Sequence, residues 1–374
     1  MRYDVAVIGA GIAGASIAAE LGKNCKAVLL EQESQPGYHT TGRSAAIFAE
    51  TYGPAPIRAL TRASAGFYHR PPEGFVENPL LSPRGVLMVA NRDQLALLET
   101  LIEDVSQNGR VERLNKKELA QMVPLLRGDA VEAGMYDVRG KDIDVNALHQ
   151  GYLRQLKQSG GDLLLNQKID ALSRQDDHWQ INAGDGLIKA STIVNAAGAW
   201  ADEIGALVGA QKIGLAPKRR TIAIIPAPAG VDVDEWPLVC GVDEDYYLKP
   251  DAGRLLISPA DETPSPPCDA QPEEIDIAIC VDRIETAFDI KVTRIENKWA
   301  GLRSFVADKC PVVGFDANVD GFFWLAGQGG YGIQSAPALS RLAAAMVLGK
   351  PSPADIMEQG LELADISPER LSER

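Results

Sequence analysis

Three glycines near the start of the chain have the spacing of a phosphate-binding turn. They form the pattern Gly9-x-Gly11-x-x-Gly14, which follows a short apolar run and opens a segment of helical composition. Gly9 permits a tight turn, Gly11 lets backbone N–H groups approach a pyrophosphate, and Gly14 allows a helix to pack closely on a strand. Glu31 ends the next apolar run about 20 residues on, where an acid can accept hydrogen bonds from a ribose. The combination predicts dinucleotide binding, with a plain βαβ unit as the alternative.

Two other segments have the small residues that a cofactor cleft requires. Residues 39–46 (HTTGRSAA) form a turn with an arginine, which suits a backbone that wraps over phosphates or an isoalloxazine ring. Residues 327–332 (GQGGYG) lie between an apolar run and a long helical segment. Glycines there permit close backbone approach, and the positive end of a helix stabilises negative charge on a reduced flavin. Ordinary polar or flexible turns are the alternative for both segments.

These motifs require strands and helices that hold them in place. Apolar runs at residues 3–8 and 26–31 flank a helical segment at 9–21, which predicts strand, helix, strand. Residues 162–198 contain a series of strand-like runs, and residues 322–349 repeat the order strand, glycine turn, helix. Because such elements occur at the start, middle and end of the chain, the segments between them must build a second lobe.

Composition excludes several classes of protein. The chain has 374 residues, 45% of them hydrophobic and 24% charged, values typical of a folded enzyme with two domains or one large α/β domain with a second lobe. Its formal net charge of −14 opposes binding to nucleic acid and to anionic lipid. The five cysteines contain no C-x-x-C pair, and the four histidines are scattered. We therefore expect no metal, no nucleic-acid partner, no membrane span and a reducing, cytoplasmic location.

Several motifs in one order resemble a family of flavoenzymes. Besides the opening fingerprint and HTTGRSAA, they are residues 194–202 (VNAAGAWAD), 299–308 (WAGLRSFVAD) and 327–334 (GQGGYGIQ). These motifs resemble those of the FAD-dependent D-amino acid oxidase family, which includes glycine oxidase and sarcosine oxidase. Over nearly the whole chain, it most resembles the D-arginine dehydrogenases of bacteria within that family. The resemblance implies FAD, which we expect to be noncovalent because the cysteines show no attachment pattern.

The resemblance also implies an α/β fold of the D-amino acid oxidase type with two lobes. FAD lies extended in a Rossmann-like lobe, and a second, α+β lobe with a mixed sheet covers the flavin ring. We expect residues 1–48, 144–212 and 304–374 to form the FAD-binding domain. Residues 49–143 and 213–303 form the expected substrate-binding domain.

Carried over position by position, the resemblance assigns residues to the cofactor and to the substrate. The cofactor residues are Gly9, Gly11, Ile12, Ala13, Gly14, Glu31, Gln32, Arg43, Ser44, Ala45, Ala46, Ile169, Ala196, Gly198, Trp200, Arg303, Gly329, Gly330, Tyr331, Gly332, Ile333 and Gln334. The catalytic residues around the substrate are Arg220, Tyr247, Arg303 and Gly330, with Tyr52 on a mobile lid and with Ile47, Val86 and Tyr331 lining the pocket. Guanidinium and phenol groups in a partly dry pocket are well suited to holding a carboxylate. A solvated basic cluster is the alternative for Arg220, which adjoins Lys218 and Arg219.

Two pocket positions depart from the D-arginine dehydrogenase pattern. That pattern has an acid after S-P-R-P, whereas this sequence has S-P-R-G followed by Val86, and Ile47 replaces a histidine. A buried cation without a partner is costly, so we expect the pocket to favour neutral or hydrophobic side chains over arginine and lysine. The alternative is that Glu50, Asp243 or Glu244 restores recognition of a cation.

Together these features predict oxidative deamination of a D-amino acid. A hydride passes from Cα to flavin N5, and water hydrolyses the resulting imino acid. The resemblance favours a dehydrogenase over an oxidase, and the electron acceptor is open among a quinone, a carrier protein and O2. One alternative is an oxidoreductase of the same fold that acts on a secondary amine of the glycine or sarcosine kind, or on a 2-hydroxy acid. Another is a non-catalytic or RNA-associated FAD-binding protein.

Overall fold

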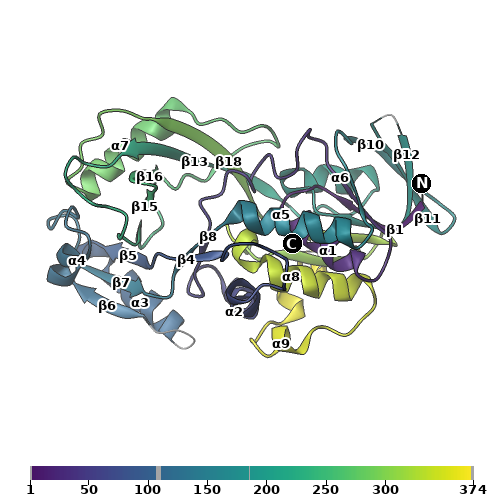
Figure 1. Ribbon diagram of the computed structural model, residues 1–374, viewed down its shortest axis with the longest axis horizontal. Helices are drawn as coiled ribbons and strands as arrows, with labels where there is room; N and C mark the ends of the chain where they lie inside the picture. Colours follow the sequence, from purple (N-terminus) through teal and green to yellow (C-terminus); the bar gives the residue numbers. More distant parts are fainter. Residues whose placement is uncertain (1, 107–110, 185, 372–374) are drawn as a thin grey trace.

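The chain folds into two lobes, each built on its own large β-sheet (Figure 1). The computed structural model describes residues 2–106, 111–184 and 186–371. The expected α/β fold with a Rossmann-like lobe is confirmed. None of the described helices is both long enough and apolar enough to cross a membrane.

The first lobe, at the right of Figure 1, contains an eight-stranded sheet. Its strands are β1 (Arg2–Ile8), β2 (Ala27–Leu30), β9 (Asp162–Leu164), β10 (Ile169–Gln175), β11 (His178–Ala183), β12 (Gly186–Asn195), β19 (Val312–Phe315) and β20 (Phe322–Ala326). The strand order is β10-β11-β12-β1-β2-β9, and β20 pairs with β12 and β19. Strand β1 is parallel to both β2 and β12, and β12 is parallel to β20. The carboxyl ends of these four strands therefore point toward one edge of the sheet.

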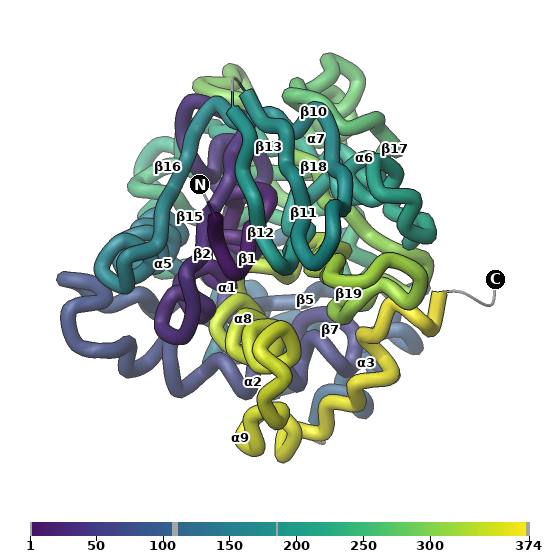
Figure 2. Tube along the Cα trace, turned by 90° about the vertical axis from the view of Figure 1, so that its right-hand side faces the viewer, coloured from purple at the N-terminus to yellow at the C-terminus, as the bar shows by residue number. Residues whose placement is uncertain are grey.

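Helices cover one face of this sheet, and a hairpin and a short helix cover the other. The helices of the first face are α1 (Ile12–Gly22), α2 (Ala55–His69), α5 (Val145–Gln158), α8 (Gly332–Val347) and α9 (Ala354–Met357), and the short helix of the other face is α6 (Ala201–Leu207). One apolar cluster joins Val5 and Val7 of β1 to buried residues of α1, α5 and α8. The other joins Ala6 and Ile8 to the β10–β11 hairpin and α6. Figure 2 shows β11, β12, β1 and β2 side by side with α8 below them.

The second lobe contains a nine-stranded mixed sheet. Its strands are β5 (Val86–Ala90), β6 (Glu112–Asn115), β7 (Ala133–Asp137), β13 (Ala216–Pro226), β14 (Leu238–Gly241), β15 (Tyr247–Asp251), β16 (Arg254–Ser258), β17 (Thr263–Pro264) and β18 (Asn297–Phe305). The order is β17-β13-β16-β15-β14-β5-β7-β6, with β18 paired to β13. Its helices are α3 (Leu95–Ser106), α4 (Lys116–Met122) and α7 (Glu274–Ala287).

Side chains alternate between the two faces of this second sheet. In β5, Leu87 and Val89 belong to the apolar cluster that packs with α4 and α7. Val86 and Met88 belong to a different cluster, which also contains Tyr247. Successive residues of a strand point to opposite faces, so the register decides which side chains meet the first lobe.

Short elements complete the chain. A three-stranded sheet in the order β3-β8-β4 consists of β3 (Ile47–Phe48), β4 (Leu81–Pro83) and β8 (Lys141–Ile143). Four 3-10 helices are present in the described residues, namely η1 (Arg92–Gln94), η2 (Gly198–Trp200), η3 (Leu363–Asp365) and η4 (Pro368–Leu371). The expected domain boundaries stay a prediction, and the boundary at residues 303 and 304 falls inside β18.

The turn between β1 and α1 depends on two glycines. Gly9 has a φ of 98°, a conformation that residues with a side chain rarely adopt. A Cβ on Gly14 would lie 1.8 Å from the carbonyl oxygen of Gly9 and 3.3 Å from a methyl group of Leu29. The helix can therefore approach the strand this closely only without a side chain at Gly14.

We predict that Gly14→Ala lowers the free energy of unfolding by about 1–3 kcal/mol, because the backbone must shift to admit the methyl group. Gly66→Ala is the matched control: Gly66 lies in α2, and nothing lies within 4 Å of an added Cβ. The free energy of unfolding of the control should rise by about 0.5–1 kcal/mol, because alanine reduces the backbone entropy of the unfolded chain. Urea denaturation followed by circular dichroism measures both changes, and equal stability of the two variants contradicts the packing argument.

Candidate active site

A cavity of about 320 Å³ lies between the two lobes. Its walls include the β1–α1 turn, residues 37–45, residues 196–200, residues 301–304 of β18 and residues 327–333. Most of these segments follow the carboxyl ends of parallel strands, where open α/β sheets bind ligands. The expected cofactor motifs are therefore brought together in one place.

Glu31 holds the glycine turn at one end of the cavity. Its Oε2 accepts a hydrogen bond from the backbone N–H of Ala10 at 2.8 Å, and its Oε1 accepts one from Glu33 at 3.0 Å. Each carboxylate oxygen has capacity for a further hydrogen bond. A ribose hydroxyl can therefore bind to the same carboxylate.

The N-terminus of α1 faces the cavity, and its N-cap residue, Gly11, has no side chain that could cap the helix. The hydroxyl of Thr41 accepts a hydrogen bond from the N–H of Ile12, the first residue of the helix, at 2.9 Å. A Cβ on Gly11 would meet a single atom within 4 Å, the Oγ1 of Thr41 at 3.2 Å. The space beside Gly11 is thus open, as approach of a pyrophosphate requires.

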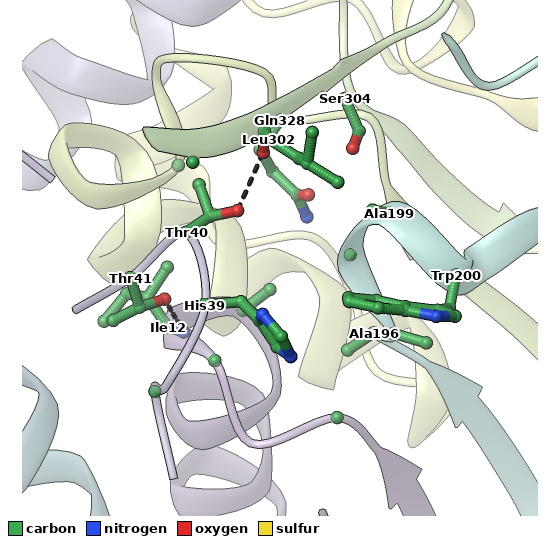
Figure 3. Close-up of a pocket in the computed structure, with 18 of the residues that line it drawn as sticks. Ile12, His39, Thr40, Thr41, Ala196, Ala199, Trp200, Leu302, Ser304 and Gln328 are labelled. Carbon is green, nitrogen blue, oxygen red and sulfur yellow. Dashed lines mark hydrogen bonds between the residues drawn. The ribbon is translucent and has the colours of Figure 1, made fainter. Parts of the chain in front are cut away.

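The segment from Thr40 to Arg43 connects the two lobes. Thr40 Oγ1 donates to the carbonyl of Leu302 at 2.7 Å, as Figure 3 shows. The Arg43 guanidinium donates to the carbonyls of Ala270 and Ala300, each at 2.8 Å, and pairs with Asp269. Arg43 lines the cavity, but these contacts show that its guanidinium also ties the cofactor segment to the second sheet.

Two rings face each other across the cavity (Figure 3). The centroids of His39 and Trp200 are 4.7 Å apart, and His39 Nε2 lies 3.0 Å from Glu33 Oε1. Trp200 ends the 3-10 helix η2, whose first residue, Gly198, has a φ of 55°. The two rings therefore contact each other in the wall of the cavity.

Buried polar atoms without a hydrogen-bond partner among the described residues lie in another part of the cavity wall. Among the described residues, Gln328 Nε2 and Ser304 Oγ are buried and make no hydrogen bond, and both residues line the cavity. Gly329, next to Gln328, has a φ of 53°, and its would-be Cβ lies 2.0 Å from the ring of Phe305. A buried polar group without a partner is costly, so these atoms fit the polar edge of a bound ring system. With Glu31 and the open glycine turn, the residues present fit FAD.

Arg303 of β18 forms the centre of the expected substrate site. In the part of the chain described, it makes no ion pair, and it packs so close to Gly330 that a Cβ there would lie 2.8 Å from Nη1. Burial alone would lower the pKa of Arg303, but nearby Tyr52, Tyr247 and Glu244 raise it above the ordinary value. The guanidinium therefore stays charged, and none of the described carboxylates lies at ion-pair distance from it.

Tyrosines surround this guanidinium. The hydroxyl of Tyr247 is buried and has no hydrogen-bond partner among the described residues. Tyr52 lies within hydrogen-bonding reach of Arg303, its hydroxyl is 3.5 Å from Glu244 Oε2, and its ring is 5.0 Å from that of Tyr331. Burial, with the Glu244 carboxylate, raises the pKa of Tyr331 to about 12 and that of Tyr52 further. Both phenols stay protonated at neutral pH.

Arg220 is the second guanidinium of the site. It is 5% exposed and lines the cavity, which excludes the alternative of a solvated basic cluster. Its Nε donates to the backbone carbonyl of Asp261 at 2.9 Å, and its Nη2 lies 3.6 Å from Glu262. In the sheet, Arg220 pairs with Gly301 and Lys218 pairs with Arg303, so the two arginines lie on neighbouring strands.

An apolar cluster lies on the same face of the second sheet. It contains Val86, with Ile47 and Tyr52 packed against it, and its other buried members include Met88, Ile222, Cys240, Tyr247 and Leu256. Glu50 is paired with Arg139 at 3.2 Å, and Asp243 accepts a hydrogen bond from Gln94 at 2.7 Å, so each of these acids already has a partner. Glu244 is the acid that faces Tyr52.

The structure places most of the predicted cofactor residues in the cavity wall. Those that line it are Gly9, Gly11, Ile12, Ala13, Glu31, Gln32, Arg43, Ser44, Ala45, Ile169, Ala196, Gly198, Trp200, Arg303, Gly329, Gly330, Gly332 and Ile333. Gly14, Ala46, Tyr331 and Gln334 lie outside the wall. Gln334 instead holds the Tyr52 segment, because its amide bonds to the N–H of Ala49 and the carbonyl of Tyr52. The individual roles of these residues stay predictions.

Sequence reasoning missed some wall residues that bear polar groups. Thr40, Thr41 and His39 lie within the segment that was identified, but the residue types did not indicate separate roles. Ser304 and Gln328 adjoin predicted residues, and only their lack of a partner distinguishes them. That signal depends on burial and was not accessible from the sequence.

Comparison with known proteins settles the family. A family model described as DAO, FAD dependent oxidoreductase, matches residues 4–346. The chain belongs to this family. Its expected membership is confirmed, and FAD is the cofactor of this oxidoreductase. The more specific similarity to D-arginine dehydrogenases stays a prediction.

Relatives of this oxidoreductase have different names. Glycine oxidase from Bacillus licheniformis is 25% identical over 361 residues, which cover 94% of this chain and 94% of the relative. Glycerol 3-phosphate dehydrogenase from Caloramator mitchellensis is 25% identical over 358 residues, which cover 90% and 72%. The structure of L-alpha-glycerophosphate oxidase from Mycoplasma pneumoniae, with FAD bound, has a TM-score of 0.83 at 18% identity and covers 93% of this chain and 95% of that chain. The fold is therefore shared by proteins named for different substrates.

We predict that Gly11→Val yields folded protein with little FAD, because the added side chain fills the space beside the α1 N-terminus. The control is Gly66→Val, which makes the same change where an added Cβ meets nothing within 4 Å. The ratio of visible to 280 nm absorbance measures flavin occupancy. Full occupancy in Gly11→Val would show that the pyrophosphate does not lie at this turn.

Proposed function

We propose that this oxidoreductase oxidises the Cα–N bond of a D-amino acid, giving an imino acid that water hydrolyses to a 2-oxo acid and ammonia. The observation that carries the proposal is the charged Arg303 guanidinium beside the unpartnered hydroxyl of Tyr247. A carboxylate would satisfy both groups at once. The D configuration follows from the motif resemblance rather than from the geometry.

Arg303 and Arg220 act as the proposed carboxylate clamp. Two guanidinium groups on neighbouring strands provide several N–H donors, and hydrogen bonds between charged groups are stronger than those between neutral ones. Because the site is partly dry, the attraction between these charges is screened less than in water. The clamp fixes the carboxylate and therefore the orientation of the attached Cα.

The tyrosines complete the grip without taking a proton. Because the pKa values of Tyr52 and Tyr331 are raised, both phenols act as hydrogen-bond donors at neutral pH. The amine of the substrate must then arrive unprotonated, since neither phenol serves as its base. When bound, FAD supplies the acceptor for the hydride that leaves Cα. The contribution of the chain to catalysis is thus orientation and exclusion of water.

The apolar cluster supports a preference for neutral or hydrophobic substrate side chains. Val86 and Ile47 belong to the same apolar cluster as Tyr52 and Tyr247, and an apolar side chain buried there gains about 25 cal/mol per Å². The competing feature is Glu244, whose carboxylate faces Tyr52. Arg303 already lies near Glu244, so a substrate cation would have to compete with a resident guanidinium for it.

Other classes of substrate share some features with a D-amino acid. Glycine oxidase is among the relatives, so a secondary amine or glycine itself is one rival, and a 2-hydroxy acid is another. Glycine, sarcosine and 2-hydroxy acids all carry a carboxylate. An RNA-associated role is disfavoured by the net charge of −14, and a non-catalytic role predicts no flavin bleaching by any small substrate. We propose dehydrogenase activity in the cytoplasm, with the acceptor open among a quinone, a carrier protein and O2.

An anaerobic substrate panel tests the proposed function. Bleaching of the oxidised flavin band is followed with D- and L-amino acids, glycine, sarcosine and 2-hydroxy acids at equal concentrations. Faster reduction by neutral D-amino acids supports the proposal, and faster reduction by any other class overturns it. Reoxidation of the reduced enzyme by O2, compared with reoxidation by a soluble quinone, separates oxidase from dehydrogenase.

We predict that Arg303→Met leaves FAD bound but raises the substrate concentration for half-maximal flavin reduction by about 10- to 150-fold, which corresponds to losing one charged hydrogen bond of roughly 1.5–3 kcal/mol. Arg303→Lys should recover only part of the loss, because lysine lacks the planar fork of arginine. Rapid-mixing spectroscopy provides the measurement. Unchanged reduction by Arg303→Met at low substrate rules out the clamp.

We predict that Val86→Glu moves the ratio of kcat/KM for D-arginine to that for D-methionine at least tenfold toward D-arginine, about 1.4 kcal/mol. Val86→Gln is the control, because it has a similar size and no charge. If the wild-type enzyme already prefers D-arginine or D-lysine by tenfold, Glu244 is the acid to test, and Glu244→Gln should abolish that preference. Such a preference would contradict the proposed apolar pocket.

A further inference from the structure

We propose that Asp261 is a positioning residue that aims Arg220 at the substrate carboxylate. The inference rests on the proposed function, since it assumes that Arg220 binds a carboxylate. Asp261 follows β16 in the loop that leads to β17, and it does not line the cavity. Its effect therefore has to pass through Arg220.

Asp261 holds Arg220 and the next residue at the same time. Its backbone carbonyl accepts the Nε–H of Arg220 at 2.9 Å. Its carboxylate accepts the backbone N–H of Thr221 at 2.6 Å and the Thr221 hydroxyl at 3.0 Å. Because Thr221 follows Arg220 on β13, the carboxylate fixes the loop against the strand that carries the arginine. The carbonyl is thereby fixed against the guanidinium.

The loop is built to bring that carbonyl into place. Ser258 Oγ donates to the carbonyl of Thr221 at 2.6 Å and accepts the N–H of Ala260 at 3.0 Å. Ala260 has a φ of 49°, a left-handed conformation that is unfavourable for alanine. Backbone strain of this kind persists only where surrounding contacts enforce it. The contacts of Ser258 and Asp261 with Thr221 supply that enforcement.

A second arginine fixes the acid from the opposite side of the strand. Arg219, 8% exposed, pairs with Asp276 at 2.9 Å and with Asp261 at 3.9 Å, and it also binds Glu273. Neighbouring residues of a strand point to opposite faces. The adjacent arginines thus have different tasks: Arg219 stabilises the acidic network behind β13, and Arg220 lines the cavity in front.

The consequence is a guanidinium whose orientation is set before substrate arrives. Its Nε edge is occupied by the Asp261 carbonyl. The Glu262 carboxylate accepts hydrogen bonds from Lys218 at 2.6 Å and from Lys309 at 3.2 Å. It lies 3.6 Å from Nη2 of Arg220, which is too far for a hydrogen bond. The terminal nitrogens therefore remain available for the substrate carboxylate. Holding a long side chain in advance reduces the entropy lost on binding.

A double-mutant cycle on the FAD-loaded enzyme tests the role. The probe is benzoate, a carboxylate without an oxidisable amine, and its Kd is obtained from the perturbation of the flavin spectrum. The proteins are wild type, Asp261→Ala, Arg220→Met and the double variant. Asp355→Ala, which removes an acid from an exposed ion pair with Arg341, controls for the general loss of a charge.

We expect Asp261→Ala to raise the Kd for benzoate about fivefold or more in the wild-type background and less than about twofold in the Arg220→Met background, because coupled residues give non-additive effects. Asp261→Asn should recover most of the affinity, since its amide can still accept the Thr221 N–H. Flavin occupancy and the Asp355→Ala control should match wild type. With a D-amino acid substrate, KM should rise while kcat changes little.

Other outcomes overturn the inference. An equal loss of affinity in both backgrounds indicates general damage to the fold, and an unchanged Kd in Asp261→Ala shows that the acid has no role. If Asp261→Ala does not fold, Thr221→Val removes one of the same hydrogen bonds and is judged by the same cycle. If wild type binds no benzoate and Arg303→Met alters no substrate reaction, the proposed function fails and the positioning role fails with it. Normal binding by wild type with no effect at Asp261 overturns the positioning role alone.

Discussion

The parallel pairing of β1 with both β2 and β12 is the constraint on which the cleft depends. In this register Val5 is opposite Ala27 on one side and Thr192 on the other, so the three strands end at one edge. Residues that are distant in sequence, such as Gly11 and Trp200, then line the same cavity. The backbone N–H groups that are free where the helices after these strands begin are the ones that a nucleotide can satisfy.

The second sheet is coupled to that edge through a few hydrogen bonds. Thr40 and Arg43, from the first lobe, bind carbonyls of β18, the strand that also carries Arg303. Trp299 of the same strand donates in return to the carbonyl of Arg43 at 3.0 Å. These three hydrogen bonds join a cofactor segment to a substrate strand. This arrangement fixes the distance between the two binding regions without help from the ligand.

The sequence was sufficient for the features that local physics determines. The glycine turn and Glu31 could be predicted because backbone conformation and spacing specify them, and the apolar runs indicated most strands of the first sheet. The partners of Arg43 and the environment of Glu244 could not be predicted, since they depend on loops that meet only in the folded chain. Residue type alone could not separate the tasks of Arg219 and Arg220, because both are basic and strand register turns them to different faces. Only the family resemblance selected Arg220.

That register also determines where the chain can change in length. Arg220 is opposite Gly301 and Lys218 is opposite Arg303, so the spacing of the two guanidinium groups is counted in paired residues. One residue inserted between Gly301 and Arg303 would turn Arg303 to the other face of the sheet. Residues 227–237 connect β13 to β14 outside both strands, and added length there leaves the pairing intact. Insertions and deletions in related sequences should therefore occur in such connections, while the paired segments keep a constant length.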